Sequence, residues 1–199
     1  VPVHNRLDEL LELLSSLRSL DLEGLELSVT IVDDKSLEPV PKKLEEEFLD
    51  LKLNVIRCDK NIGPARARNI GLKDSVAEFF WFLDSDAEID DPQVLNHMIE
   101  TLKTYSEIGA VGGVVELAEG EWQVFEPVTF LNTLVIPQYL HRKNYPITFV
   151  SLICTANLLI SRKVFELTNG FDESLPRNED EDLCLTLKKL QYKSMQSGS

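Results

Sequence analysis

The stretch that decides the fold is residues 79–86, with the sequence Phe-Phe-Trp-Phe-Leu-Asp-Ser-Asp. The run from Phe79 to Leu83 is short, apolar and rich in aromatic residues, which is typical of a strand covered on both faces. Such a strand belongs in the middle of an α/β sheet. Open α/β sheets bind ligands beyond the carboxyl ends of their strands, and Asp84 and Asp86 follow this strand directly. The stretch therefore predicts a ligand site at these two acids.

The spacing of Asp84 and Asp86 favours a metal in that site. Two carboxylates that converge on one point repel each other unless a cation lies between them. Mg²⁺ and Mn²⁺ take oxygen ligands and are usually shared with substrate phosphates. The two acids therefore predict a metal–diphosphate site. The alternative, from this tripeptide alone, is a solvated acidic turn.

The composition describes one domain of ordinary size. The chain has 199 residues, of which 43% are hydrophobic and 27% are charged, so it is long enough to bury a full core. Its 34 acidic and 20 basic residues give a net charge of −14. Because phosphate neutralisation needs a basic surface, we expect no nucleic-acid partner.

The cysteines and the apolar segments bear on where the protein works. The three cysteines are widely spaced and form neither a metal-ligand pattern nor a disulfide framework, which favours a reducing, cytoplasmic location. The longest apolar stretch, residues 149–160, is broken by polar residues and is too short to span a bilayer.

Val1-Pro2-Val3 is typical of the end of a strand, and residues 191–195 begin a further element. We therefore expect a domain truncated at both ends.

Apolar periodicity predicts helices that alternate with strands. Leucines at helical spacing in residues 7–17 predict a first helix that packs on the sheet, with Asn5 as its N-cap. Residues 25–32 and 51–58 predict core strands, and residues 44–50 predict a helix between them. The alternation is that of an α/β domain.

Two further acids, Asp33 and Asp34, follow the strand predicted at residues 25–32. They are the second acid pair at the carboxyl end of a predicted core strand, which favours a ligand site there too. The alternative is a capping turn into the next segment, because Asp is common where strands end.

Residues 61–71 predict a helix whose N-terminus could meet a phosphate. Gly63 frees the backbone, Pro64 suits the first turn, and helix N-termini attract phosphate groups. Arg66 and Arg68 could supply the positive charge of a nucleotide site. The dinucleotide fingerprint G-x-G-x-x-G does not occur. The alternative is an amphipathic helix with solvated arginines.

The middle of the chain is less regular. Residues 110–117 predict a strand that contains Gly112 and Gly113, where glycines permit the close approach of a ligand or backbone. Residues 119–148 are poorly periodic, and long irregular stretches are often functional. Their aromatic side chains suit either sugar or lipid recognition or a core.

A dense acid cluster, Asn-Glu-Asp-Glu-Asp at residues 178–182, opens a predicted helix. Acids in a first turn complement the helix dipole, and this accounts for some of them. Four acids in a row exceed what capping requires. One of them could be held as a general base.

Taken in order, these motifs form a set that is far more specific than any one of them. They are Val1-Pro2-Val3-His4-Asn5, Val32-Asp33-Asp34, Asn61-x-Gly63 followed by Ala67-Arg68-Asn69-x-Gly71, Asp84-Ser85-Asp86, Gly170-Phe171-Asp172-Glu173 and Glu179-Asp180-x-Asp182. The set resembles the family-2 glycosyltransferases, which are inverting enzymes with the GT-A fold. The resemblance covers nearly the whole chain.

The resemblance implies an α/β fold of the GT-A type, with a Rossmann-like mixed sheet, mostly parallel, flanked by helices. It implies a single catalytic domain over residues 1–199, with a nucleotide-sugar-binding half at residues 1–117 and an acceptor-side half at residues 118–199. The partners would be a nucleotide-diphosphate sugar donor and a saccharide or lipid-linked acceptor. Many relatives act on lipid-linked acceptors, which leaves open a peripheral contact of the full-length protein with the inner face of the membrane.

The resemblance also implies a role for each matching residue. Asp180 would be the catalytic base, and Asp84 and Asp86 would hold Mn²⁺ or Mg²⁺. Glu179, Asp182 and Asp172 would shape the acceptor side. Asp34, with Asp33 beside it, would hold the nucleotide base. The full set of donor-binding residues would be Pro2, Asn5, Asp33, Asp34, Gly63, Arg68, Asp84, Ser85 and Asp86.

One loop departs from the family, and two alternatives remain. Residues 35–38 read Lys-Ser-Leu-Glu where the family often has Gly-Ser-x-Asp, which leaves the shape of this loop open. A phosphatase with an aspartyl nucleophile also carries D-x-D after a strand, but Gly-Thr usually follows, and this chain has Ala87-Glu88. The other alternative is a non-catalytic module of the same fold that binds a nucleotide sugar or glycan. Slow donor hydrolysis without acceptor would separate an enzyme from that module.

Overall fold

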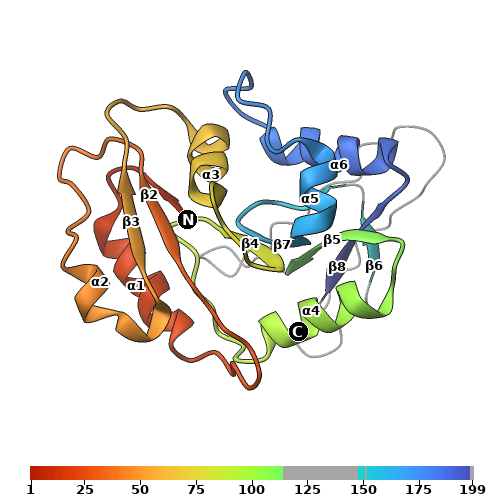
Figure 1. The fold of residues 1–199 in the computed structure, drawn as a ribbon, viewed down its shortest axis with the longest axis horizontal. Coiled ribbons are helices and arrows are strands. Elements are labelled where there is room, and N and C mark those ends of the chain that lie inside the picture. The colour runs from red at the N-terminus through yellow and green to blue at the C-terminus, as the bar shows by residue number, and fades with distance from the viewer. Residues whose placement is uncertain (114–147, 151, 198–199) are drawn as a thin grey trace, which may run out of the picture.

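The fold is built from two β-sheets that lie side by side with helices around them (Figure 1). It is seen in a computed structural model, which describes residues 1–113, 148–150 and 152–197. Strands and helices alternate along the chain, so the expected α/β class is confirmed.

The first sheet is parallel and has the strand order β1-β2-β3. Parallel neighbours need a crossover connection, and a helical segment lies between each pair of these strands. Val32 pairs with both Pro2 and Ile56, so the carboxyl ends of the three strands meet at one edge. The elements are β1 (Pro2–Val3), α1 (Leu7–Leu17), β2 (Thr30–Asp33), α2 (Leu44–Glu47), the 3-10 helix η1 (Leu49–Leu51), β3 (Asn54–Arg57) and α3 (Pro64–Leu72).

The second sheet is mixed and has the strand order β4-β7-β5-β8-β6. β5 and β8 pair in parallel, whereas β7 is antiparallel to both β4 and β5, and β6 is antiparallel to β8. The elements are β4 (Phe79–Leu83), α4 (Val94–Thr104), β5 (Ile108–Gly113), β6 (Thr148–Val150), β7 (Asn157–Ser161), α5 (Arg162–Thr168), α6 (Glu179–Lys189) and β8 (Lys193–Ser197).

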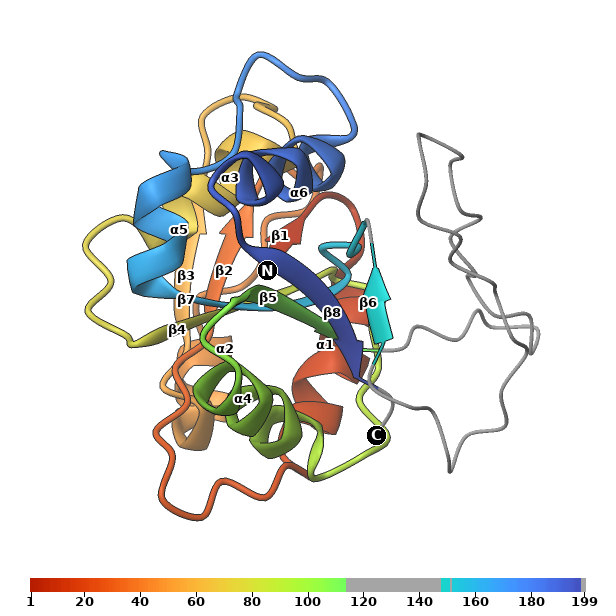
Figure 2. The ribbon, with the colours of Figure 1, turned by 90° about the vertical axis from the view of Figure 1, so that its right-hand side faces the viewer.

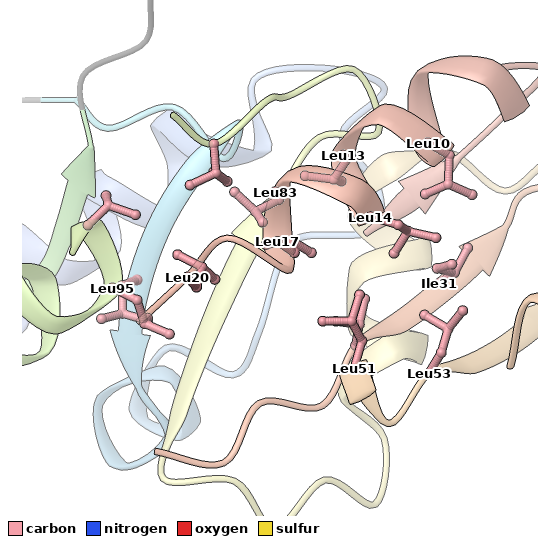
Figure 3. Packing of buried hydrophobic residues seen from close by; sticks show 14 of the residues in the cluster. Leu10, Leu13, Leu14, Leu17, Leu20, Ile31, Leu51, Leu53, Leu83 and Leu95 are labelled. Carbon is pink, nitrogen blue, oxygen red and sulfur yellow. The ribbon is translucent and has the colours of Figure 1, made fainter. Parts of the chain in front are cut away.

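One apolar core joins the two sheets through α1. The leucines of α1 recur at helical spacing, as predicted, and Leu10, Leu13 and Leu14 are fully buried. Figure 3 shows them between Ile31 of the first sheet and Leu83 of the second, which belong to the same cluster. Burial of each such side chain contributes about 1.5–3 kcal/mol. The relative position of the two sheets therefore rests on α1.

Strand β4 is covered on both faces, as its aromatic run predicted. Phe80 and Phe82 pack in the cluster with Phe165 of α5 and residues of α6. Leu83 lies on the opposite face, in the cluster that α4 and α1 share. Figure 2 shows α4 and α6 on opposite sides of β5 and β8. The alternation of side chains along β4 therefore serves two separate cores.

Gly112 and Gly113 of β5 allow side chains, not a ligand or a backbone, to approach closely. A Cβ on Gly112 would lie 3.3 Å from Cβ of Ile153 and closer still to its Cγ2. A Cβ on Gly113 would lie 2.7 Å from Cγ of Asn157. The side chain of Asn157 is held there because its Oδ1 accepts a hydrogen bond of 2.8 Å from Nε1 of Trp81.

The variant Gly113→Ala is therefore expected to lose about 1–3 kcal/mol of unfolding free energy, because overpacking forces neighbouring groups to shift. Urea unfolding followed by circular dichroism measures this. An unchanged midpoint would contradict the packing described for Asn157.

Three expectations differ from the structure. The strand expected at residues 25–32 is confined to Thr30–Asp33, and β3 starts at Asn54 because Lys52 takes the left-handed conformation with φ 45°. Asn5 is not the N-cap of α1, because Arg6 holds that position. The Asn5 side chain instead accepts a hydrogen bond of 2.7 Å from the backbone N–H of Leu37.

The irregular stretch at residues 119–148 lies almost wholly outside the described residues, as do residues 114–117 of the strand expected at 110–117. In the part of the chain that the structure describes, no helix is long and apolar enough to cross a membrane.

Candidate active site

The acid Asp34 fixes the loop that leads into α3. It follows β2 directly, and its two carboxylate oxygens accept hydrogen bonds of 2.7 Å from the N–H of Ile62 and 2.9 Å from that of Gly63. Gly63 has φ 84°, a value that suits glycine, and Pro64 opens α3. Asp34 is only 5% exposed. The strand end and the α3 N-terminus are thereby tied together.

Asp33 has no exposed surface and shapes the loop of residues 34–40. Its carboxylate accepts hydrogen bonds of 2.8 Å from the N–H of Ser36 and 3.1 Å from that of Val40, and it forms an ion pair with Arg57. Burial acts to raise the pKa of Asp33, but these hydrogen bonds outweigh it and lower the pKa. Both carboxylate oxygens of Asp33 are thus already bonded to the protein. The nucleotide contact expected of Asp33 stays a prediction.

A cavity of about 340 Å³ opens where β1, α3, β4 and α6 meet. Figures 1 and 2 show α3 and α6 on the same side of the molecule, above the end of β4. Five of the predicted site residues line the cavity, namely Pro2, Arg68, Asp84, Glu179 and Asp180. The other predicted site residues do not line it, namely Asn5, Asp33, Asp34, Gly63, Ser85, Asp86, Asp172 and Asp182.

The guanidinium of Arg68 lies between two of these acids. Its Nη2 donates to Oδ1 of Asp84 over 2.7 Å, and its Nη1 donates to Oε1 of Glu179 over 2.5 Å. The Arg68 side chain is only 3% exposed. Its Nε is buried and finds no protein acceptor among the described residues. The sequence predicted that the positive charge of Arg68 could serve a nucleotide. In the structure this charge is already paired with two carboxylates of the protein.

The two acids of the D-x-D motif pair with different arginines. Asp84 pairs with Arg68, whereas Asp86 forms an ion pair with Arg6, just before α1. Ser85 between them is buried. The two arginines therefore offset the repulsion between the Asp84 and Asp86 carboxylates. From the sequence, this role was expected of a metal ion.

The residues present fit a divalent metal that arrives with a diphosphate. No group of three or more metal-binding side chains comes together within the described residues. Mg²⁺ and Mn²⁺ sites of this kind use one or two carboxylates and complete their shell with phosphate oxygens and water. The side chains of Asp84 and Asp86 are 37% and 47% exposed, so both can be reached from solvent. The donor set is thus sufficient for a shared site and too small for a closed protein site.

Asp180, which the resemblance implies as the base, lies at the start of α6. It is the second residue of α6, it is half-buried and it lines the cavity. Burial, with help from the negative charge of Glu179, raises the pKa of the Asp180 carboxyl above its usual value. Asn178, with φ 65°, turns the chain sharply just before the helix. A carboxylate with a raised pKa binds a proton more readily, as a base must.

The Gly170–Glu173 turn docks on α3 rather than on the cavity. Asn69 accepts a hydrogen bond of 3.0 Å from the N–H of Phe171 and donates one of 2.9 Å to its carbonyl oxygen. Glu173 forms an ion pair of 2.8 Å with Arg66. Asp172 is exposed, and its carboxylate accepts hydrogen bonds from Ser174. The motif therefore holds α3 against the second half of the chain.

Five cavity residues are not among the predicted site residues. They are Pro64, Cys154, Thr155, Arg177 and Asn178. Burial raises the pKa of the Cys154 thiol to about 11, so it is protonated at neutral pH. The only sequence signal for Arg177 is its place just before the acid cluster, because its spacing matches no motif.

The arrangement of strand-end acids, a helix N-terminus and a half-buried carboxylate can be compared with known proteins. A family model described as Glycosyl transferase family 2 matches residues 1–168. The chain belongs to glycosyl transferase family 2. It is 29% identical over 195 residues to a pre-mycofactocin glycosyltransferase of Mycobacterium tuberculosis, and the match covers 94% of this chain and 38% of that relative. The family 2 chain thus spans well under half of that relative's length.

Solved structures confirm the GT-A fold of this family 2 chain. S. aureus TarS in complex with UDP-GlcNAc superposes with a TM-score of 0.72 at 21% identity, over 100% of this chain and 54% of TarS. The mannosyltransferase PcManGT of Pyrobaculum calidifontis, in complex with GDP-Man and Mn²⁺, gives a TM-score of 0.71 at 17% identity, over 99% of this chain and 55% of PcManGT. At these identities the likeness concerns the fold.

Proposed function

We propose that this family 2 domain transfers a sugar, with inversion, from a nucleotide-diphosphate sugar to an acceptor hydroxyl. The observation that carries the proposal is that Asp180, whose pKa is raised by burial, lines the same cavity as Asp84. Inversion needs a base on one face of the sugar and the leaving group on the other. A base on α6 and a donor-side acid at the end of β4 meet this need.

The donor side of the proposal rests on Asp84 and Asp86. Their carboxylates would hold Mn²⁺ or Mg²⁺ together with the donor's diphosphate, and the metal, when bound, would offset the charge that grows on the leaving nucleoside diphosphate. The nucleotide would lie against the carboxyl ends of β1 and β2, where Pro2, Asn5, Asp34 and Gly63 gather. The nucleotide sugars bound by TarS and PcManGT support this donor class.

The chemistry is a single displacement at the anomeric carbon. The acceptor oxygen forms a bond to that carbon while the bond from the carbon to the diphosphate oxygen breaks. Asp180 takes the proton of the acceptor hydroxyl, and the electron pair of the broken bond leaves with the nucleoside diphosphate. A positioned general base of this kind contributes about 10²–10⁴-fold to the rate. The acceptor would be a saccharide or a lipid-linked saccharide.

The direct test is release of nucleoside diphosphate from UDP-GlcNAc and GDP-Man, each with Mn²⁺ and without acceptor. Slow release above the buffer rate, absent in Asp180→Asn, is expected for an enzyme because water can take the acceptor's place. Tight binding of a nucleotide sugar with no release, and no transfer to any of a panel of glycan acceptors, would favour the non-catalytic binding module instead.

The pH dependence follows from the raised pKa of Asp180. The base must be ionised to accept a proton, so the rate is full above this pKa and falls as the pH drops through it. Because burial raises the pKa, the acid limb of kcat/KM should lie above the ordinary Asp value of about 4. A rate profile from pH 4 to 9 measures it, and a limb at or below the ordinary value would contradict the assignment.

A further inference from the structure

The side chain of Arg68 contacts both sides of the cavity. Asp84 follows β4 on the donor side, and Glu179 opens α6 beside Asp180. The two acids are separated by almost a hundred residues and belong to different layers of the fold. Within the described residues, the Arg68 guanidinium is the only group that forms an ion pair with both carboxylates.

We propose that Arg68 is a positioning residue that couples the donor-side acid Asp84 to Glu179 and, through it, to the neighbouring base Asp180. The inference rests on the proposed function, and it replaces the donor contact expected of Arg68 from the sequence. Both terminal nitrogens of Arg68 are committed to protein carboxylates, and 97% of its side chain is shielded from solvent, since it is 3% exposed.

The geometry requires arginine and not merely a positive charge. The guanidinium is planar and carries its donors in a rigid fork, so it can hold two carboxylates at a fixed separation. A lysine ammonium is a single compact charge. Within the described residues, the Nε of Arg68 finds no acceptor, so the hydrogen bonds that Arg68 makes to carboxylates are the two at its Nη atoms.

The bonds of Arg68 hold both Asp84 and the first turn of α6. Arg68 uses Oδ1 of Asp84. The carboxylate of Asp84 would still be one of the groups that hold a metal when the donor is bound. Arg68 also holds the first turn of α6, in which Asp180 is the second residue. A change in the position of Asp84 is thereby transmitted to the base through one side chain.

The test compares Arg68→Lys and Arg68→Gln with the control Arg18→Gln, which removes an exposed, ion-paired arginine that does not line the cavity. Arg68→Lys keeps the charge and is expected to lower kcat at least tenfold with the acid limb of the pH profile almost unmoved. Arg68→Gln should also shift that limb to higher pH, because a positive charge near Asp180 is lost. Arg18→Gln should change neither. Full rescue by lysine would overturn the proposal and favour a direct phosphate contact.

Thermal unfolding measures the energetic coupling between Arg68 and Glu179, and it needs no substrate. Removing Arg68 leaves the buried carboxylate of Glu179 and the partly exposed one of Asp84 without their partner, so Arg68→Gln should lower Tm by about 10 °C. The double variant Arg68→Gln/Glu179→Gln should regain much of this loss while kcat stays low, which gives a large coupling term in the double-mutant cycle. Additive effects would overturn the proposal, as would a lowered Tm with normal kcat and pH profile. If the wild-type domain turns over no donor, the proposed function fails, whereas this cycle still decides the coupling.

Discussion

Replacement of Asp180 by asparagine is expected to abolish sugar transfer while donor binding is retained. Asparagine keeps the size of the side chain but cannot accept the acceptor's proton, so the rate should fall by about 10²–10⁴-fold. The donor is held from the other side of the cavity, at Asp84 and the strand ends, and its affinity should be almost unchanged. Transfer is measured by release of nucleoside diphosphate with acceptor present, and donor affinity by titration calorimetry.

The matched control is Glu181→Gln, which neutralises the next acid of the same helix turn. Glu181 is exposed and does not line the cavity, so its loss should leave the rate close to that of the wild type. Equal loss of donor binding and transfer in Asp180→Asn would contradict the role of Asp180 as base. A comparable rate loss in Glu181→Gln would assign the effect to the charge of the cluster as a whole.

Replacement of Asp86 by alanine is expected to remove the metal dependence of nucleotide binding. Asp86 is one of two accessible carboxylates at the end of β4, and a shared metal site with so few protein ligands cannot lose one without a large effect. Nucleotide affinity measured with Mn²⁺ should fall at least about tenfold, which is about 1.4 kcal/mol. Titration with and without EDTA separates the metal-dependent part.

Arg6→Gln is the sharpest control for that variant. It removes the ion-pair partner of Asp86 and leaves the carboxylate in place. If Asp86 is a metal ligand, Arg6→Gln should bind the metal–nucleotide complex at least as tightly as the wild type, because a competing cation has gone. Weakened binding in Arg6→Gln, with an unchanged affinity in Asp86→Ala, would show that the arginine and not the acid serves the nucleotide.

Much of the local structure could be predicted from the sequence because it depends on local pattern. The aromatic run ending at Leu83 is the strand β4, covered on both faces, and the leucine spacing of residues 7–17 is the helix α1. The ordered motifs identified the family, which the family model confirms. These features follow from periodicity and from residues that are close together in the chain.

The pairing of charges could not be predicted, because it depends on contacts between distant residues. Arg68 and Glu179 are 111 residues apart, and Arg6 and Asp86 are 80 apart. Sequence spacing places Asp84 and Asp86 at one strand end but does not say that each meets a different arginine. In the same way, the sequence Asp33-Asp34 at the end of β2 carried no sign that Asp33 would be fully buried and bonded to the loop that follows. Motifs give the position of a carboxylate, and the tertiary fold decides what it contacts.

The central claim is that the domain binds a nucleoside diphosphate through a metal on Asp84 and Asp86. A thermal-shift panel of UDP, GDP, dTDP and CDP, each with and without Mn²⁺, tests this most directly. A ligand at about a hundred times its Kd stabilises by about 2.7 kcal/mol, which should raise Tm by several degrees. The account predicts that one nucleotide stabilises the domain and does so only with Mn²⁺. No stabilisation by any of them, or an equal shift in EDTA, would contradict it.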